Sequence, residues 1–421
     1  MRDMKYSGIP SIGNIPSHWE VSRIKSLLSL RSENNSGDRE LLSVYLDRGV
    51  ISYNDSTGMQ VHKPSADLSN YQNVYVGDFV LNNQQAWRGS VGVSKYDGII
   101  SPAYFVYDMS EKCDPLYMNF LLRDGSMVQQ YETSSRGVGT IQRNLYALWF
   151  YESLVALPPM NEQKAIAAFL DGKCAEINSL VADVQAQIDV LEQYKRSVIT
   201  ETVTKGLNPD VEMKDSGIEW VGMIPSHWPV HPVYTYFGER KNKNKFGTED
   251  NLLSLSYGRV IRKDINTSDG LLPESFNTYN IVESGDIIIR PTDLQNDKRS
   301  LRTGLVKEHG IITSAYIDLC PIKKVDSRYF HFLLHAYDVI KVFYNMGNGV
   351  RQGLNYSEFS RLMVFEPQYE EQVTIADFLD DKVTEIDGII DQKKEQLEVL
   401  DSYKKSLIYE YVTGKREVPT A

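Results

Sequence analysis

The chain has 421 residues, a formal net charge of -11 and three cysteines. Its length exceeds what one hydrophobic core usually organises, so we expect two domains of ordinary size. The odd number and scattered positions of the cysteines exclude a disulfide framework and a zinc finger. The absence of an 18-residue apolar run and of an apolar stretch near the first residue predicts a cytoplasmic protein without membrane spans.

The sequence contains two copies of one repeat, at an offset of 209 residues. Ile-Pro-Ser-His-Trp at residues 15–19 recurs at 224–228. Glu162-Gln163 and the Ile-Ala and Phe-Leu-Asp groups that follow recur from Glu371-Gln372 onward. This repetition gives the same two-domain organisation as the length does.

The first copy predicts short strands separated by turn residues, then one helix and a final apolar strand. The expected strands are residues 41–45, 74–81, 91–95, 99–107 and 152–157, and the expected helix is 115–131. A long helix follows over residues 162–204, where apolar side chains alternate steps of three and four from Leu170 to Val198. This stripe is the heptad seam of a coiled coil.

The second copy repeats that order. Its expected strands are 252–257, 286–290, 304–307, 311–319 and 362–365, with a helix over 327–344. Its long helix carries the same seam from Ala376 to Leu407, with one extra lysine inside it, and Gly172 and Gly388 are destabilising residues within the two helices. The narrow seam favours antiparallel pairing of the two helices. The alternative is two amphipathic helices that each lie on their own domain. Paired helices would act as a spacer between the domains.

The predicted fold class is α+β, with a pseudo-twofold internal repeat. The predicted boundaries are 1–158 for the first domain, 159–206 for the first long helix, 207–367 for the connector and second domain, and 368–421 for the second long helix and tail. The two domains share their frame but differ in their intervening loops, which suggests two related binding tasks on different targets.

These doubled motifs resemble the specificity subunit of type I restriction-modification enzymes. The resemblance covers essentially the whole chain: the Gly-x-Ile-Pro-x-His-Trp opening and the Pro-x-x-x-Glu-Gln-x-x-Ile-Ala-x-Phe-Leu-Asp helix start each occur twice, although the second helix start departs from the first at 368–370. It implies that each domain recognises one half of a split double-stranded DNA target, while the helix pair sets the gap. It also implies two modification subunits that resemble adenine methyltransferases, and restriction subunits with motor and nuclease activity. S-adenosylmethionine, ATP and Mg²⁺ are then expected in the partners, and no cofactor in this chain.

The sequence itself lacks the motifs of catalysis: neither an Asn/Asp-Pro-Pro-Tyr tetrad nor a Gly-rich phosphate loop occurs. His331 and His335 have the spacing of two metal ligands, but no glutamate follows His331 and the first copy has Asn119 and Arg123 there. His18 and His227 are interpreted as packed domain openings. We therefore expect neither catalytic nor metal-binding residues. A self-contained nuclease remains as a minor alternative, because Pro209-Asp210 and the Glu212-Met213-Lys214 run imitate a nuclease motif in the connector.

Candidate DNA-reading loops combine amide, guanidinium and aromatic side chains, because Arg pairs with guanine and Gln or Asn with adenine in the major groove. The candidates of the first copy are Gln84, Gln85, Trp87, Arg88, Arg136, Gln142 and Arg143. Those of the second copy are Arg290, Asp293, Gln295, Asn296, Lys298, Arg299, Arg302, Arg351 and Gln352. The acidic net charge predicts weak DNA affinity without basic partners. The alternative function is a coiled-coil adaptor whose two domains bind proteins.

Overall fold

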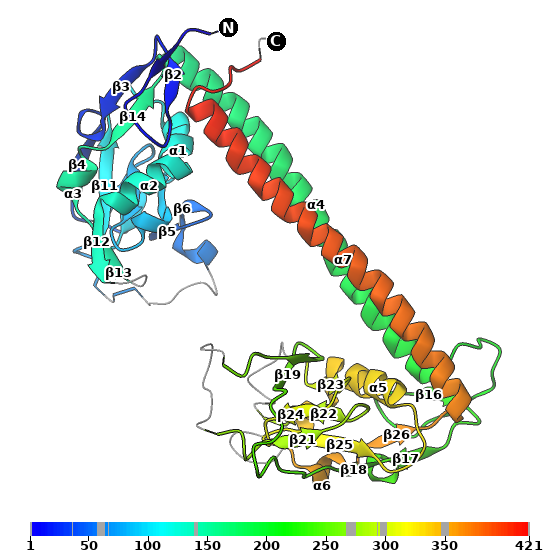
Figure 1. The fold of residues 1–421 in the computed structure, drawn as a ribbon. Coiled ribbons are helices and arrows are strands. Elements are labelled where there is room, and N and C mark those ends of the chain that lie inside the picture. Colours follow the sequence, from blue (N-terminus) through cyan, green and yellow to red (C-terminus); the bar gives the residue numbers. More distant parts are fainter. Residues whose placement is uncertain are drawn as a thin grey trace. The chain divides into compact units, whose positions relative to one another are not determined.

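The fold is described from a computed structural model. It covers the chain except residues 1, 36, 57–63, 66, 139–141, 267–274, 293, 295–300, 347–352, 420 and 421. The chain forms two compact units (Figure 1). The first unit contains Met1–Val184 and Glu395–Ala421, and the second contains Gln185–Lys394.

The first unit opens with a hairpin and is built around a four-stranded antiparallel sheet in the order β4-β11-β8-β9. The sheet strands are β4 (Leu28–Arg31), β11 (Tyr104–Met109), β8 (Phe79–Asn82) and β9 (Val91–Val93). Two-stranded pairs surround it: β1 (Met4–Tyr6) with β2 (Asn14–Pro16), β3 (Glu20–Arg23) with β14 (Leu154–Leu157), β5 (Leu42–Tyr45) with β6 (Gly49–Ser52), β7 (Gln72–Val74) with β10 (Gly98–Ile100), and β12 (Ser135–Val138) with β13 (Gln142–Leu145). The helices are α1 (Pro115–Arg123), α2 (Gly125–Thr133), α3 (Ala147–Phe150) and the short 3-10 turns η1 (Ile24–Ser26), η2 (Tyr53–Ser56) and η3 (Ala86–Arg88).

The second unit repeats this plan around the sheet β18-β25-β22-β23. Its sheet strands are β18 (Phe237–Glu239), β25 (Ile317–Pro321), β22 (Ile287–Ile289) and β23 (Thr303–Leu305). Its pairs are β15 (Met213–Asp215) with β16 (Met223–Pro225), β17 (Val230–Pro232) with β26 (Met363–Phe365), β19 (Leu253–Ser256) with β20 (Arg259–Arg262), and β21 (Asn280–Val282) with β24 (Gly310–Ile312). The helices are α5 (Ser327–Val339), α6 (Tyr356–Phe359), η4 (Val233–Thr235) and η5 (Val342–Asn345).

Three predicted strands are each broken in two. The expected strand 74–81 is interrupted at Gly77, whose φ of 95° belongs to a turn, and the Asp78 carboxylate accepts a hydrogen bond from the Tyr75 amide there. The strands expected over 99–107 and 311–319 are interrupted by turns. In these turns the amides of Tyr104 and Tyr316 donate hydrogen bonds to the carbonyls of Ser101 and Thr313. These turns were missed because the apolar residues on both sides of them form an almost continuous run.

The predicted helix over 115–131 is two helices, because Asp124 ends α1 and also caps α2. Its side chain accepts a hydrogen bond from the Ser126 amide at 2.9 Å, and its own extended backbone separates the two helices. The predicted helix over 327–344 likewise stops at Val339, and the 3-10 turn η5 follows it. A short Asp side chain favours a cap over a helix interior, which is the physical reason for the first break.

Two long helices contribute to both units: α4 (Met160–Lys205) and α7 (Tyr369–Val412). In the first unit Phe169 lies against Tyr411 with ring centroids 4.6 Å apart, and Lys404 donates to Asn178 at 2.8 Å. In the second unit Lys195 lies 2.6 Å from Asp387. Residue numbers along the two helices run in opposite directions, so the predicted antiparallel pairing is confirmed within each unit.

The predicted heptad seam coincides with the least exposed stripe of each helix. Leu170, Ile177, Val184 and Ile188 on α4 are at most 5% exposed, and the other seam positions from 170 to 198 are buried or half-buried. Gly172 and Gly388 lie on open faces, where an added Cβ atom would meet nothing within 4 Å. The helix ends join the hydrophobic cores, since Tyr411 and Val412 belong to the first core and Ile199 and Val203 to the second.

Candidate nucleic-acid interface

The same side chains anchor the long helices to their domain in both units. Trp19 is fully buried, and its indole donates to Glu162 on α4 at 2.9 Å. Trp228 is also fully buried and donates to Glu371 on α7 at 3.0 Å. The preceding histidines contact the same carboxylates, with distances of 2.5 Å from His18 to Glu162 and 3.0 Å from His227 to Glu371. These histidines anchor the domain openings, and their imidazoles remain nearly half exposed.

The other ends of the helices are held in the same duplicated manner. The Tyr117 hydroxyl donates to the carbonyl of Val412 at 3.1 Å, and the Tyr329 hydroxyl donates to the carbonyl of Val203 at 3.1 Å. Both tyrosines are fully buried, and burial raises their pKa values well above the ordinary tyrosine value. Each domain is therefore attached both to the start of one long helix and to the end of the other.

The loop after β8 carries the first group of predicted DNA-reading residues. The Asn83 side chain ties this loop to β13 by accepting a hydrogen bond from the Leu145 amide at 3.0 Å, and the Trp87 indole donates to the Gln84 carbonyl at 3.1 Å. Gln84 and Arg88 are exposed, whereas Gln85 and Trp87 are half-buried.

The structure brings these residues together with the predicted residues of the β12–β13 hairpin. Guanidinium groups of Arg88 and Arg143 lie 4.6 Å and 4.9 Å from the centre of the Trp87 ring. Arg143 also pairs with Glu132 at 2.9 Å. Arg136 is exposed on β12 and lies 4.3 Å from the ring centre of Trp149. The first domain thus presents a group of arginines stacked on indoles, an arrangement suited to binding base edges or phosphates.

Fewer of the predicted residues in the second domain can be placed. Asp293, Gln295, Asn296, Lys298, Arg299, Arg351 and Gln352 lie outside the described residues, as does the side chain of Gln142 in the first domain. Arg290 is half-buried at the end of β22. The DNA contacts predicted for these residues stay a prediction.

Arg302 has a different environment from the one its predicted role requires. It is fully buried, and its guanidinium donates to the carbonyls of Thr292 at 2.5 Å and Arg290 at 3.4 Å. Its amide donates to the buried carboxylate of Asp338 at 2.5 Å. In this conformation the side chain organises the backbone of the loop after β22 and is not exposed to a base.

Sequence reasoning missed three exposed apolar side chains on and beside α3. Tyr146, Leu148 and Trp149 are 49%, 79% and 41% exposed. Comparison of the two copies provides a signal that could have found two of them, because Ser357 and Glu358 occupy the positions equivalent to Leu148 and Trp149. Surface residues this apolar in one copy alone are candidates for binding.

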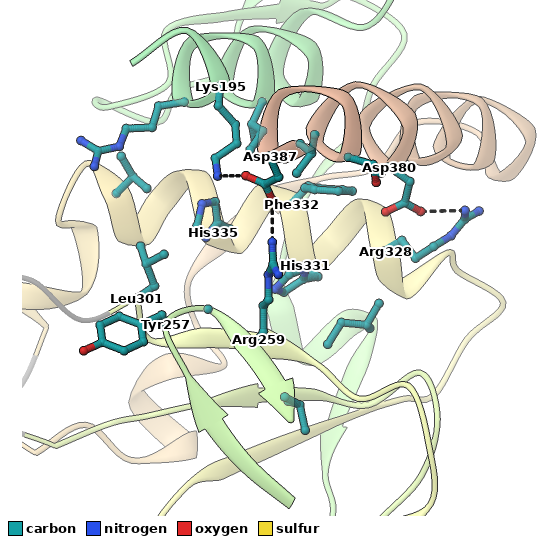
Figure 2. A pocket seen from close by; sticks show the side chains of 18 of the residues that line it. Lys195, Tyr257, Arg259, Leu301, Arg328, His331, Phe332, His335, Asp380 and Asp387 are labelled. Atoms are coloured by element: carbon teal, nitrogen blue, oxygen red, sulfur yellow. Dashed lines mark hydrogen bonds and ion pairs between the residues drawn. The ribbon is translucent and has the colours of Figure 1, made fainter. Parts of the chain in front are cut away.

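A cavity of about 730 Å³ lies in the second unit between α5, the β19–β20 turn and both long helices (Figure 2). The Asp387 carboxylate of α7 forms ion pairs across this cavity with Lys195 of α4 at 2.6 Å and with Arg259 of β20 at 2.5 Å. His331 and His335 also line it. Burial lowers the pKa of His331 to about 3 and that of His335 to about 4, so both imidazoles are neutral at pH 7.

The described residues contain no group of three His, Cys, Asp or Glu side chains placed to hold a metal ion. None of the described helices is apolar enough over a sufficient length to cross a membrane. The three cysteines are free thiols, of which Cys113 and Cys174 are buried.

Comparison with known proteins identifies relatives over nearly the full length. The chain is 24% identical over 439 aligned positions to a putative type I restriction enzyme MjaX specificity subunit from Methanocaldococcus jannaschii, covering 97% of this chain and 96% of the relative. It is 23% identical to the type I restriction enzyme MjaVIII specificity subunit of the same organism, covering 96% and 94%. The expected resemblance to type I specificity subunits is confirmed. No protein-family model matches the chain.

A solved structure shares the fold of this chain. It comes from work on complex assembly and conformational transition of the type I R-M system, and the two chains superpose with a TM-score of 0.69 at 14% identity, covering 96% of this chain and 99% of that one. The predicted α+β class with two domains and a long helix pair is thereby confirmed.

Proposed function

We propose that the chain is the non-catalytic DNA-recognition subunit of a type I restriction-modification complex. The observation that carries this proposal is the similarity to specificity subunits over 97% of the chain. The duplicated anchoring of each domain to both long helices supports it, because two equivalent modules on one scaffold suit two recognition tasks.

In this proposal each domain binds one half of a split double-stranded DNA target. The stacked arginines of the first domain supply charge and hydrogen-bond donors for this binding. The net charge of -11 makes strong independent binding to DNA unfavourable. Basic partner subunits would therefore supply much of the affinity for phosphates.

The partners in this proposal are two modification subunits, which dock on the helix pair and the domains, and restriction subunits. S-adenosylmethionine, ATP and Mg²⁺ belong to those partners. The helix pair sets the spacing between the two halves of the target, because its length fixes how far apart the attached domains are held.

Reconstitution with the cognate modification subunit tests the proposal. The complex should methylate adenines within one split sequence, and omitting this chain should abolish methylation at that sequence. Gel shifts with the same complex should show tighter binding to a duplex that contains this target sequence than to a scrambled duplex. Equal binding to both duplexes in every partner combination would contradict the proposal and favour a protein-binding adaptor.

A further inference from the structure

Arg136, Tyr146, Leu148 and Trp149 form an exposed surface on and beside α3, here termed the α3 platform. Leu148 is 79% exposed and Trp149 is 41% exposed. The Tyr146 and Trp149 rings lie side by side with centroids 5.3 Å apart. Exposing large apolar side chains in a group favours binding over solvation.

The second copy of the repeat shows that this surface is dispensable for folding. At the equivalent turn, α6, Ser357 and Glu358 replace Leu148 and Trp149, while the buried Phe150 has a buried counterpart in Phe359. There Asn355 and Glu358 form a capping box that satisfies the start of the helix. Because α6 forms with polar residues, the apolar residues of α3 are not required by the turn itself.

Arg136 is the polar component of the platform. It lies on β12 opposite Asn144, with its guanidinium 4.3 Å from the ring centre of Trp149. Among the described residues, Arg143 of the same hairpin forms an ion pair with Glu132 of α2, whereas Arg136 forms none. Its donors are exposed, whereas stacking on the indole restricts the plane of the guanidinium.

We propose that Arg136 determines specificity for a guanine in the half of the target bound by the first domain, and that Trp149 is its positioning residue. This inference rests on the proposed DNA-recognition function. A planar guanidinium pairs with the O6 and N7 atoms of guanine through two parallel hydrogen bonds in the major groove. The stack on Trp149 restricts rotation of that plane before binding, and Leu148 provides apolar surface that excludes water beside the pair.

A phosphate contact is the competing role for Arg136, and it has different requirements. A phosphate accepts a lysine ammonium as well as a guanidinium, and it carries no information about the base. A lysine ammonium is a point charge without the planar fork of arginine, so it replaces arginine less well at a guanine edge than at a phosphate. The two roles therefore predict different results for Arg136→Lys.

The experiment uses the chain reconstituted with its modification subunits and duplexes of its own target. Each guanine in the half assigned to the first domain is replaced in turn by 7-deazaguanine, which lacks the N7 acceptor. With the wild-type chain, replacement of one guanine should lower the methylation rate roughly 10- to 100-fold, the size of one lost hydrogen bond from a charged donor. The same replacements in the other half provide the reference.

The variants Arg136→Ala and Arg136→Lys should both lower the methylation rate of the natural target. Replacing that guanine with 7-deazaguanine should then lower the rate of either variant only a little further. Trp149→Ala should reduce the penalty at the same guanine while leaving the dependence on the other half unchanged. Arg23→Ala removes an exposed arginine that pairs with Glu152 in the same domain, and it should behave as wild type. Unfolding temperatures of all variants check that the domain remains folded.

Three results would overturn the inference: a target half without guanine, full activity of Arg136→Lys, or an unchanged 7-deazaguanine penalty in Arg136→Ala. These results are distinct from a failure of the proposed function. If the wild-type complex methylates no defined sequence, the function is wrong and the inference falls with it. If it methylates a defined sequence without regard to Arg136, the inference alone is wrong.

Discussion

A buried carboxyl group, Asp318 on β25, distinguishes the second domain from the first. It is 1% exposed, and neither of its oxygens has a hydrogen-bond partner among the described residues. Burial, together with the nearby Asp286 carboxylate, raises the pKa of Asp318 to about 8. The equivalent position in the first domain is Val106, which is paired with β8 as Asp318 is with β22.

Asp318→Asn should stabilise the second domain, by about 1–3 kcal/mol at pH 8, because it removes a buried ionisable group whose oxygens accept no hydrogen bond and whose distance to Arg240 is 3.9 Å. The raised pKa means that the contribution of Asp318 to stability is present below about pH 4 and is lost as the pH rises toward 8. The gain should therefore be larger at pH 8 than at pH 5, as measured by chemical denaturation and by hydrogen exchange of β25. A gain that shrinks as the pH rises would contradict this explanation. Asp286→Asn is the control and should destabilise the second domain, because the Asp286 carboxylate forms an ion pair with Arg240 at 2.7 Å.

At the residue scale the sequence predicted the stacked group in the first domain only in part. Trp87, Arg88 and Arg136 were found because their chemistry suits base contacts. Trp149 was missed because an apolar residue near a strand is more often in the core, and nothing in its own neighbourhood shows that it is exposed. Arg302 was misplaced for the opposite reason, since a guanidinium is usually at the surface and here it is buried among backbone carbonyls.

Gly388 lies in the interior of α7 and Gly414 lies just beyond its end, and only the second position requires a glycine. Gly388 lies in the helix with open space around it, whereas Gly414 follows the helix with a φ of 71°, at a place where an added Cβ atom would meet Pro16 and Trp19 of the first domain. A left-handed conformation is costly for any residue with a Cβ atom, and here that atom would also collide with Pro16.

Gly388→Ala should raise the free energy of unfolding by about 1 kcal/mol, the helix-propensity difference between the two residues. Gly414→Ala should lower it by at least about 1–2 kcal/mol through backbone strain. Chemical denaturation of the full chain measures both changes. Effects of the same sign would be incompatible with the geometry described for the two positions.

In the second unit an ion-pair network links the helix pair to the domain at a position that is uncharged in the first unit. Asp387 binds both Lys195 and Arg259, whereas its equivalent in the first unit is Asn178, which binds Lys404. The carboxylate is only 20% exposed, so this network is screened less than a surface pair.

Asp387→Asn should loosen the β19–β20 hairpin and increase its hydrogen exchange, because Arg259 loses its partner on α7. The reciprocal change Asn178→Asp should strengthen the contact with Lys404 and leave β19–β20 unaffected. Hydrogen exchange followed by mass spectrometry resolves both peptides. Unchanged exchange of β19–β20 in Asp387→Asn would show that the network does not hold the hairpin.

The long elements were the most predictable part of the fold. A seam repeated over about eight turns identifies α4 and α7 almost to their ends, since their burial follows one physical rule. The short elements were less predictable, because turns at Gly77 and Asp124 depend on single hydrogen bonds within apolar runs.

At the scale of the whole molecule, the proposed role of the helix pair predicts how the target changes with helix length. Adding one heptad to each helix at facing positions preserves the seam and adds about 10.5 Å at 1.5 Å per residue. The gap between the target halves should grow by about three base pairs, at about 3.4 Å per step, without a change in either half. Sequencing of methylated adenines reports the new gap.

A matched insertion of four residues in each helix is the control for this lengthening. It shifts the apolar stripe out of register, so we expect a loss of stability and of methylation in place of a new spacing. An unchanged gap after heptad insertion in an active complex would show that the helices do not set the distance.

The central claim is that two separate domains each specify one half of the target. Its most direct test is the set of methylated adenines in a host that carries the complete system, compared with the same system after residues 24–150 are exchanged for those of another specificity subunit. We predict a split sequence in the first host and a change in one half alone in the second. An unsplit target, a change in both halves, or the same methylated sites in both hosts would contradict the claim.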